Sequence, residues 1–196
     1  MLTGERVVLR AQNRQDVEDQ HTQMAGDYEL HSIMDTTAWR PVGLEAALAR
    51  YDQTLAEPAD PKGAWFSVSR RDDPALTWLG RAGLWNIDEY QSTAHIGIML
   101  AAGARGKGLG TDCVRVLCDY AFRVRGLHRV SVETLATNQA MLHAARAAGF
   151  TEEGRLREHA FLLGTRVDEV VLGLLRSEWS ARPSHRKVCR CRRERG

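Results

Sequence analysis

Residues Arg105 to Gly110 combine three alternating glycines with two basic side chains in the order Arg-Gly-Lys-Gly-Leu-Gly. Glycine has no Cβ atom, so a backbone rich in glycine can bring its N–H groups close to an anion. If a helix begins here, its first N–H groups are unpaired and its dipole favours negative charge. The segment therefore predicts a phosphate-binding loop in which Arg105 and Lys107 add positive charge. A glycine-rich turn without a ligand is the alternative that these residues leave open.

The spacing of the glycines differs from that of two common nucleotide-binding motifs. The Walker motif requires Gly-x-x-x-x-Gly-Lys followed by Ser or Thr, and the dinucleotide-binding fingerprint requires Gly-x-Gly-x-x-Gly. In this chain the third glycine comes only two positions after the second, and no Ser or Thr follows the Gly-Lys pair. Neither nucleotide-binding fold is supported.

The loop lies between a predicted strand and a predicted helix. Residues 92–100 read as the last strand of an antiparallel meander that begins with strands at 64–69 and 77–85. After the loop, apolar residues recur at the spacing of one helix face, at Val114, Leu117, Cys118, Ala121 and Phe122. We expect this helix to pack on the sheet.

Similar patterns predict the remaining elements. Near the N-terminus we expect a strand at 6–10, a helix that Asn13 caps and that runs toward Ala25, and a helix at 44–55. Toward the C-terminus we expect a strand at 129–135, a helix from Asn138 to Ala148 with Gly149 as its C-cap, and a hairpin of 157–163 with 167–175.

The composition indicates one globular domain. The chain has 196 residues, of which 43% are hydrophobic and 27% charged, and no stretch approaches the roughly 18 apolar residues of a membrane span. We assign residues 1–179 to this domain and expect a cytoplasmic protein without membrane contact. Four cysteines imply no disulfide framework, and we expect no metal, because the Cys189-x-Cys191 pair lacks a second pair of ligands.

The charge is divided unevenly between this domain and the C-terminal tail. Residues 180–196 contain seven of the 27 Lys and Arg residues and one of the 25 acidic residues, so the tail carries +6 and the rest of the chain −4. The tail has almost no apolar residues and is predicted to be disordered. The acidic body favours a cationic partner. The tail offers a means of association with ribosomal RNA, although a simply solvated tail is the alternative.

The Arg105-x-x-Gly108-x-Gly110 motif resembles the acetyl-CoA signature of the GNAT superfamily of N-acetyltransferases. The rest of the chain is similar to the RimJ/RimL-type branch, which acetylates protein N-termini and small amines. The similarity covers about residues 2 to 179 and includes four further segments, Gly4 to Arg10, Ala94 to Gly97, Gly149-Phe150 and Gly164 through Trp179. It implies an α/β (α+β) fold, with a mixed, strongly twisted sheet whose fourth and fifth strands splay apart, flanked by helices.

The resemblance also implies where the cosubstrate acetyl-CoA binds. Backbone groups of Met99 and Leu100 would bind the pantetheine arm in the gap between the splayed strands. The loop Arg105, Gly106, Lys107, Gly108, Leu109 and Gly110, with Thr111, would bind the pyrophosphate. Asn138 matches a family position on the cofactor side, and a plain helix cap is its alternative role. A longer acyl-CoA is not excluded by the sequence.

The reaction implied by the resemblance is direct attack of a neutral amine on the thioester. A lysine-like amine of pKa about 10.4 needs roughly 4.6 kcal/mol to lose its proton at pH 7, so a general base is useful. The family often supplies an acidic residue where this chain has His95. A histidine of ordinary pKa is mostly neutral at pH 7 and can preserve that role, with a strand histidine that only packs as the alternative. Glu133, on the fifth strand, is the second candidate base.

Two family positions depart from the pattern. Many relatives place a Ser and a Tyr where this chain has Met141 and Ala145, so no general acid is nominated. The alternative function is a non-catalytic CoA-binding module used for regulation or assembly. The sequence leaves open whether the acceptor is a small-molecule amine or a protein N-terminus, and whether the protein is a monomer or a homodimer.

Overall fold

The computed structural model describes residues 1–34 and 37–181, in which the strands form one mixed sheet in the order β1-β2-β3-β4-β5-β6-β8-β7. All neighbouring strands are antiparallel except β5 and β6. The strands are β1 (Leu2–Thr3), β2 (Val7–Arg10), β3 (Ala64–Arg70), β4 (Gly80–Asp88), β5 (Thr93–Leu100), β6 (Arg129–Leu135), β7 (Thr151–Leu162) and β8 (Thr165–Leu175). The predicted class, a mixed sheet flanked by helices, is confirmed.

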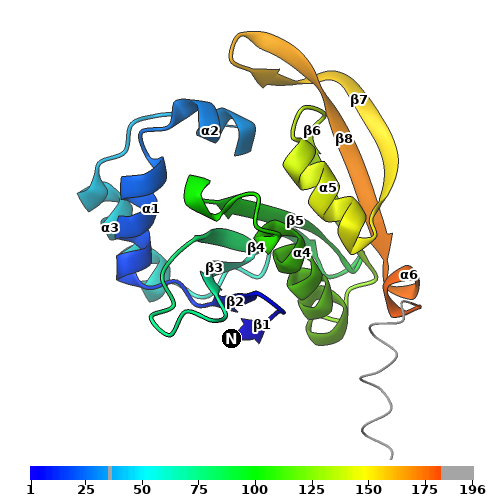
Figure 1. Ribbon diagram of the computed structural model, residues 1–196, viewed down its shortest axis with the longest axis horizontal. Helices are drawn as coiled ribbons and strands as arrows, with labels where there is room; N and C mark the ends of the chain where they lie inside the picture. The colour runs from blue at the N-terminus through cyan, green and yellow to red at the C-terminus, as the bar shows by residue number, and fades with distance from the viewer. Residues whose placement is uncertain (35–36, 182–196) are drawn as a thin grey trace, which may run out of the picture.

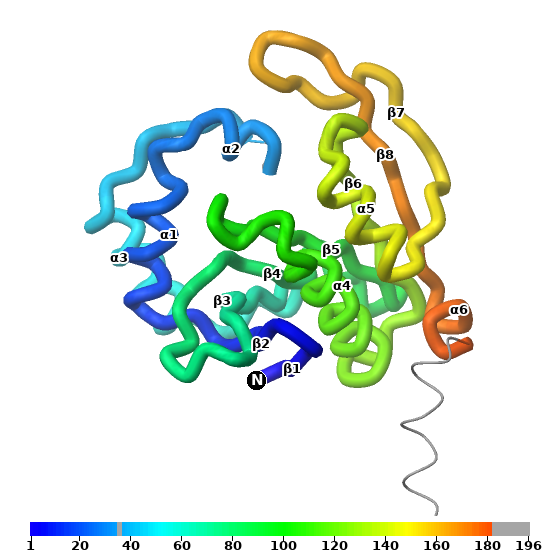
Figure 2. Tube along the Cα trace, in the orientation of Figure 1, coloured from blue at the N-terminus to red at the C-terminus, as the bar shows by residue number. Residues whose placement is uncertain are grey.

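The helices lie in two groups on either side of the molecule's centre (Figure 1). They are α1 (Arg14–Met24), α2 (Tyr28–Met34), α3 (Leu44–Ala56), α4 (Leu109–Asp119), α5 (Gln139–Ala148) and α6 (Arg176–Ser180). The chain trace in Figure 2 shows α1, α2 and α3 on one side, and α5 with the long β7–β8 hairpin on the other. Helix α4 lies nearer the centre and packs against α5.

Two of the helices begin at the caps that the sequence predicted. Asn13 caps α1 with a reciprocal pair of hydrogen bonds. The Asn13 side chain accepts from the Asp16 N–H, and the Asp16 side chain accepts from the Asn13 N–H. Asn138 caps α5 by accepting from the Met141 N–H, and Gly149 ends that helix with a left-handed φ of 94°. These local signals fix where each helix starts relative to the sheet.

The core lies between the sheet and α4. Val114, Leu117 and Phe122 are fully buried, as are Leu9 and Leu84 from the strands below them. The predicted apolar face of the helix is therefore confirmed, and it continues past α4 through a π-helical turn at Tyr120–Val124. This packing holds the N-terminal end of α4, and the glycine loop before it, against the ends of β2 and β5.

Strands β5 and β6 pair over only three positions and then separate. The pairs are Thr93 with Arg129, Ala94 with Val130 and His95 with Ser131. Beyond His95, β5 still pairs with β4, while β6 pairs with β8 along its whole length. The splayed pair that the resemblance implied, the fourth and fifth strands of the prediction, is thus present.

Several boundaries differ from the predictions. The strand predicted at 77–85 runs from Gly80 to Asp88, and the strand predicted at 157–163 begins at Thr151. Helix α2 and the two-residue strand β1 were not predicted. The tail predicted to be disordered lies almost wholly outside the described residues. Among the helices that are described, none has the length and apolar character that a bilayer crossing requires.

Candidate active site

The glycine loop is built around two left-handed glycines at the start of α4. Gly106 has φ of 72° and Gly108 has φ of 76°, values that L side chains rarely adopt. A Cβ atom added to Gly106 would meet nothing within 4 Å, so the space beside it is open. Within the described part of the chain, the N–H groups of residues 106 to 108 donate no hydrogen bond. They are available to an anion together with the first N–H groups of α4, those of Leu109, Gly110 and Thr111.

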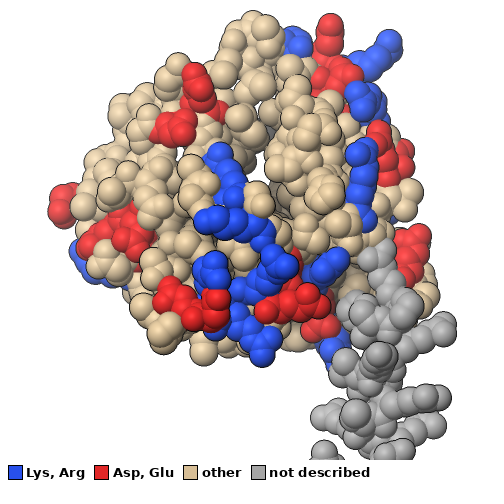
Figure 3. Space-filling model, viewed as in Figure 1, with Lys and Arg blue, Asp and Glu red and all other residues tan. Residues whose placement is uncertain are grey.

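Basic side chains surround this loop. Arg6 Nη1 donates to the Lys107 carbonyl at 3.0 Å, Arg105 Nε donates to the Leu100 carbonyl at 2.9 Å, and Lys107 Nζ donates to the Gly103 carbonyl at 2.7 Å. None of these three side chains forms an ion pair with a carboxylate in the described structure. Figure 3 shows Lys and Arg side chains gathered across this face, with acidic side chains beside them.

A cavity of about 240 Å³ opens beside the loop and extends the basic region. It is lined by Glu5, Arg6, Gly108, Thr111, Asp112, Arg115, His143 and Ala147. Buried Asp112 accepts hydrogen bonds from the N–H groups of Glu5, Arg6 and Val7, which holds the β1–β2 turn against α4. The sequence reasoning did not identify Arg6 and Arg115 as site residues. Arg6 reaches the loop from 101 residues away along the chain, through its contact with the Lys107 carbonyl, which no local pattern reveals. Arg115 lies on α4 and lines the same cavity.

The two candidate bases lie next to each other at the point where β5 and β6 separate. His95 Nδ1 is 3.6 Å from Glu133 Oε1, and the two side chains are 19% and 36% exposed. His95 Nδ1 is buried and forms no hydrogen bond within the described residues. The imidazole packs against the Trp85 ring, with ring centroids 4.6 Å apart and the planes tilted by 39°. The sequence nominated these residues separately, and the fold brings them together.

The other predicted site residues differ in how many of their polar groups already form contacts within the protein. Asn138 Oδ1 accepts from the Met141 N–H at 3.2 Å, and its Nδ2 donates to Thr134 Oγ1 at 3.0 Å. Its carbonyl oxygen thus caps α5, and its amide nitrogen binds β6. Met99 and Leu100 lie on the part of β5 that is not paired with β6, so their backbone borders the gap.

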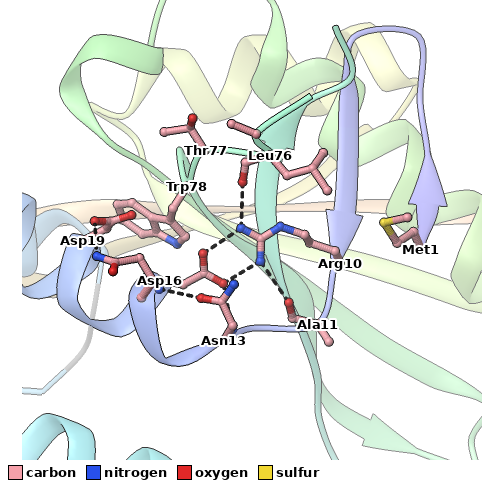
Figure 4. Close-up of a pocket in the computed structure, with 11 residues that line it drawn as sticks. Met1, Arg10, Ala11, Asn13, Asp16, Asp19, Leu76, Thr77 and Trp78 are labelled. Carbon is pink, nitrogen blue, oxygen red and sulfur yellow. Dashed lines mark hydrogen bonds and ion pairs between the residues drawn. The ribbon is translucent and has the colours of Figure 1, made fainter. Parts of the chain in front are cut away.

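A second cavity contains none of these residues. It has a volume of about 650 Å³ and lies beside α1, near the ion pair of Arg10 with Asp16 (Figure 4). Arg10 donates to both carboxylate oxygens of Asp16 and to the carbonyls of Ala11 and Leu76. Asp16 also accepts from Ser67 Oγ at 2.9 Å. Because these polar groups satisfy one another, they attach α1 to the sheet and offer little to a reacting ligand.

Comparison with known proteins shows which family and which proteins this chain resembles. Residues 6–151 match the acetyltransferase (GNAT) domain family. The provisionally named ribosomal N-acetyltransferase YdaF of Bacillus subtilis strain 168 is 34% identical over 100 residues, which span 51% of this chain and 55% of that protein. The provisionally named N-acetyltransferase YjcK of the same organism is 27% identical over 180 residues, which span 89% of this chain and 97% of that one.

The same fold is found in a crystal structure of spermidine N-acetyltransferase from Vibrio cholerae in complex with CoA and spermine. That structure superimposes with a TM-score of 0.75 at 23% identity, covering 88% of this chain and 97% of the other. The family match extends over most of the chain and includes the glycine loop, the start of α4 and both splayed strands. The chain therefore belongs to the acetyltransferase (GNAT) domain family, and the enzyme class that its motifs indicated, an acetyl-CoA-dependent N-acetyltransferase, is confirmed.

Proposed function

We propose that the Arg105–Gly110 loop binds the pyrophosphate of acetyl-CoA and that His95, assisted by Glu133, takes the proton of the acceptor amine. The observation that carries the proposal is the spatial relation of the two sites. The loop, with its free N–H groups, precedes α4 at one end of β5, and the His95–Glu133 pair lies on β5 and β6 where the strands separate. A pantetheine arm that enters between the strands would carry the thioester from the first site toward the second.

In the proposed reaction the amine nitrogen attacks the thioester carbonyl carbon. A C–N bond forms, the C–S bond breaks, and CoA leaves as the thiolate. Since His95 Nδ1 is buried and faces Glu133, the other ring nitrogen, Nε2, is the atom that takes the amine proton. Glu133 then stabilises the imidazolium that forms, as a carboxylate does beside a charged histidine. A thiolate of pKa about 8.5 is a tolerable leaving group without a general acid.

The buried cysteines support direct transfer over an acyl-cysteine intermediate. Cys113 and Cys118 are both buried in the core, and burial, with a smaller contribution from Asp112, raises the pKa of Cys113 to about 12. A thiol is nucleophilic only as the thiolate. At neutral pH Cys113 is therefore a poor nucleophile, which agrees with direct attack by the amine.

For the acceptor we propose a primary amine, either a small molecule or a protein N-terminus. Both classes appear in the names of similar proteins, a spermidine N-acetyltransferase and a ribosomal N-acetyltransferase. A ribosomal acceptor would also suit the basic residues of the tail, which can contact RNA phosphates.

Substitution of Gly108 tests the cosubstrate site and the activity together. We expect acetyl-CoA to raise the Tm of the wild type and free thiol to be released when an amine is added. Gly108→Asp should abolish both effects, because it places an anion among the converging N–H groups. Gly126→Asp is the matched control, since Gly126 also has a left-handed φ, of 68°, but lies beyond α4. Unchanged CoA affinity in a folded Gly108→Asp variant would refute the site, and CoA binding without thiol release from any amine would favour the non-catalytic module.

A further inference from the structure

A continuous row of side chains crosses the sheet on the face opposite α4. The strand register pairs Trp65 with Gly83 and Ser67 with Arg81. It also pairs Trp85 with His95. Ala82, Leu84 and Ile96, which alternate with these residues, belong to the core under α4. The row therefore faces the other way and runs from Arg81, over Trp65 and Trp85, to the proposed base.

Two glycines provide the space in which Trp65 lies. A Cβ atom at Gly83 or at Gly97 would come within 2.8 Å of the Trp65 ring, and one at Gly97 would also come within 3.4 Å of Trp85. Contacts under 3.0 Å require the ring to move. The indole of Trp65 thus lies flat across β4 and β5 and reaches the neighbourhood of Trp85. Although they are large and apolar, these two tryptophans are 42% and 38% exposed, so they form an open aromatic surface.

Arg81 lies at the end of this surface without an anionic partner. Its guanidinium carbon is 5.0 Å from the centroid of the Trp65 ring. No hydrogen bond or ion pair joins the guanidinium to any described residue, whereas several other arginines pair with carboxylates, among them Arg10, Arg14 and Arg129. Burial lowers the pKa of the Arg81 guanidinium below its usual value. A partly desolvated cation that stacks on an aromatic ring and has free N–H groups is suited to receive an oxyanion.

We infer that the acceptor amine carries a carboxylate or phosphate group that pairs with Arg81 while its body lies across Trp65 and Trp85. This inference rests on the proposed function, because it assumes that the amine end reaches His95. The inference disfavours a polyamine as the acceptor, because a polyamine would place a second cation beside Arg81. A guanidinium provides two parallel N–H groups for one oxyanion and repels an ammonium group.

The strand register sets the distance between the anionic group and the amine of such an acceptor. Arg81 and Trp85 are four residues apart on β4, which is about 13 Å along a strand, and Trp85 is paired with His95. Because the Arg81 side chain leans over Trp65 toward the base, the anion and the amine should be on the order of 10 Å apart. Free α-amino acids are too short for this separation. A long ω-amino acid, an aminoalkyl phosphate or a short peptide has the required length.

The test measures binding and turnover with amines of one length and different end groups. The probes are 8-aminooctanoate, 8-aminooctyl phosphate, uncharged octylamine and 1,8-diaminooctane. Binding is measured by calorimetry on enzyme saturated with CoA. We expect the wild type to bind the better of the two anionic probes roughly 10- to 100-fold more tightly than octylamine, and the diamine more weakly still. The better anionic probe identifies carboxylate or phosphate as the group recognised.

Arg81→Met should remove this preference and leave the affinity for octylamine nearly unchanged, and Arg81→Lys should restore part of it. Arg50→Met, at an exposed position of α3, is the control for loss of one positive charge. Equal binding of the diamine and the anionic probes by the wild type, or an unchanged preference in Arg81→Met, would overturn the inference. Thiol release is recorded separately with acetyl-CoA, so selective binding without thiol release would count against the proposed function and not against the anion site.

Discussion

His95 is held between an aromatic ring and a carboxylate at the point where the two central strands separate. The imidazole packs against the Trp85 ring, with centroids 4.6 Å apart and the rings tilted by 39°, and Glu133 lies 3.6 Å from its buried nitrogen. A histidine that only packed on the sheet would not need a carboxylate at that position. In the proposed reaction, Glu133 would give His95 the electrostatic support that a general base requires.

We predict that His95→Ala lowers kcat/KM for a lysine-like amine by about 10²- to 10⁴-fold and leaves CoA binding intact. The deficit should shrink as pH rises, because a larger fraction of the amine then arrives already deprotonated. It should shrink more completely for an α-amine, whose pKa near 8 lies within the measured range. Steady-state kinetics between pH 6 and 9 provide the measurement, with His128→Ala, at an exposed histidine, as the control. Wild-type kcat/KM in His95→Ala across this range would return His95 to a packing role.

At the scale of elements, the sequence predicted those that carry strong local signals. Capped helices such as α1 and α5 were located within one or two residues. Helix α2 was missed because it has seven residues and buries none of them, so it shows no apolar periodicity. The start of β7 was missed because most of the edge strand is exposed and begins with a polar run. The candidate loop could be predicted from adjacent residues, whereas the Arg81 row depends on strand pairing that the sequence does not specify.

Helix α1 is attached to the sheet by one buried carboxylate. Burial raises the pKa of Asp16, but hydrogen bonds from Arg10, from the Asn13 N–H and from Ser67 outweigh that effect, and the net pKa is below its usual value. A carboxylate with a depressed pKa in the folded state contributes stability above its unfolded pKa, near 3.9, and the contribution is lost as pH falls through the folded value. This contact should therefore weaken only in acid.

We predict that Asp16→Asn lowers the free energy of unfolding at pH 7 by about 3 to 5 kcal/mol, since it leaves Arg10 buried without its partner. Urea unfolding between pH 7 and 3 provides the measurement. The gap between wild type and variant should narrow at the acid end, as protonation removes the same charge from the wild type. Asp72→Asn, which breaks an exposed ion pair with Arg70, is the control and should change the free energy of unfolding little. A gap that stayed constant with pH would show that Asp16 acts through its shape and hydrogen bonds, not its charge.

At the scale of the whole molecule, the described chain ends in a short helix that closes the core beside α4. Trp179 of α6 is 8% exposed, and its ring lies 5.3 Å from that of Phe122. The resemblance to the family extended to this tryptophan, and the structure gives the physical reason. The predicted boundary after residue 179 thus falls within α6, one residue before its end at Ser180. The basic residues that follow add charge of the opposite sign to that of the acidic body.

We predict different effects on the Tm for removal of the residues that follow α6 and for truncation of the buried Trp179 side chain. Removing residues 182–196 should leave the Tm and the turnover of small amines nearly unchanged, because the buried contacts of α6 are retained. Trp179→Ala should instead lower the Tm by roughly 10 °C, since truncating a buried tryptophan costs about 3 to 5 kcal/mol and each kcal/mol shifts a domain of this size by about 2 to 4 °C. Thermal unfolding of the two variants beside the wild type decides the matter. If the truncation lowered the Tm as much as Trp179→Ala does, the tail would have to dock on the body, and the domain boundary proposed from composition would be wrong.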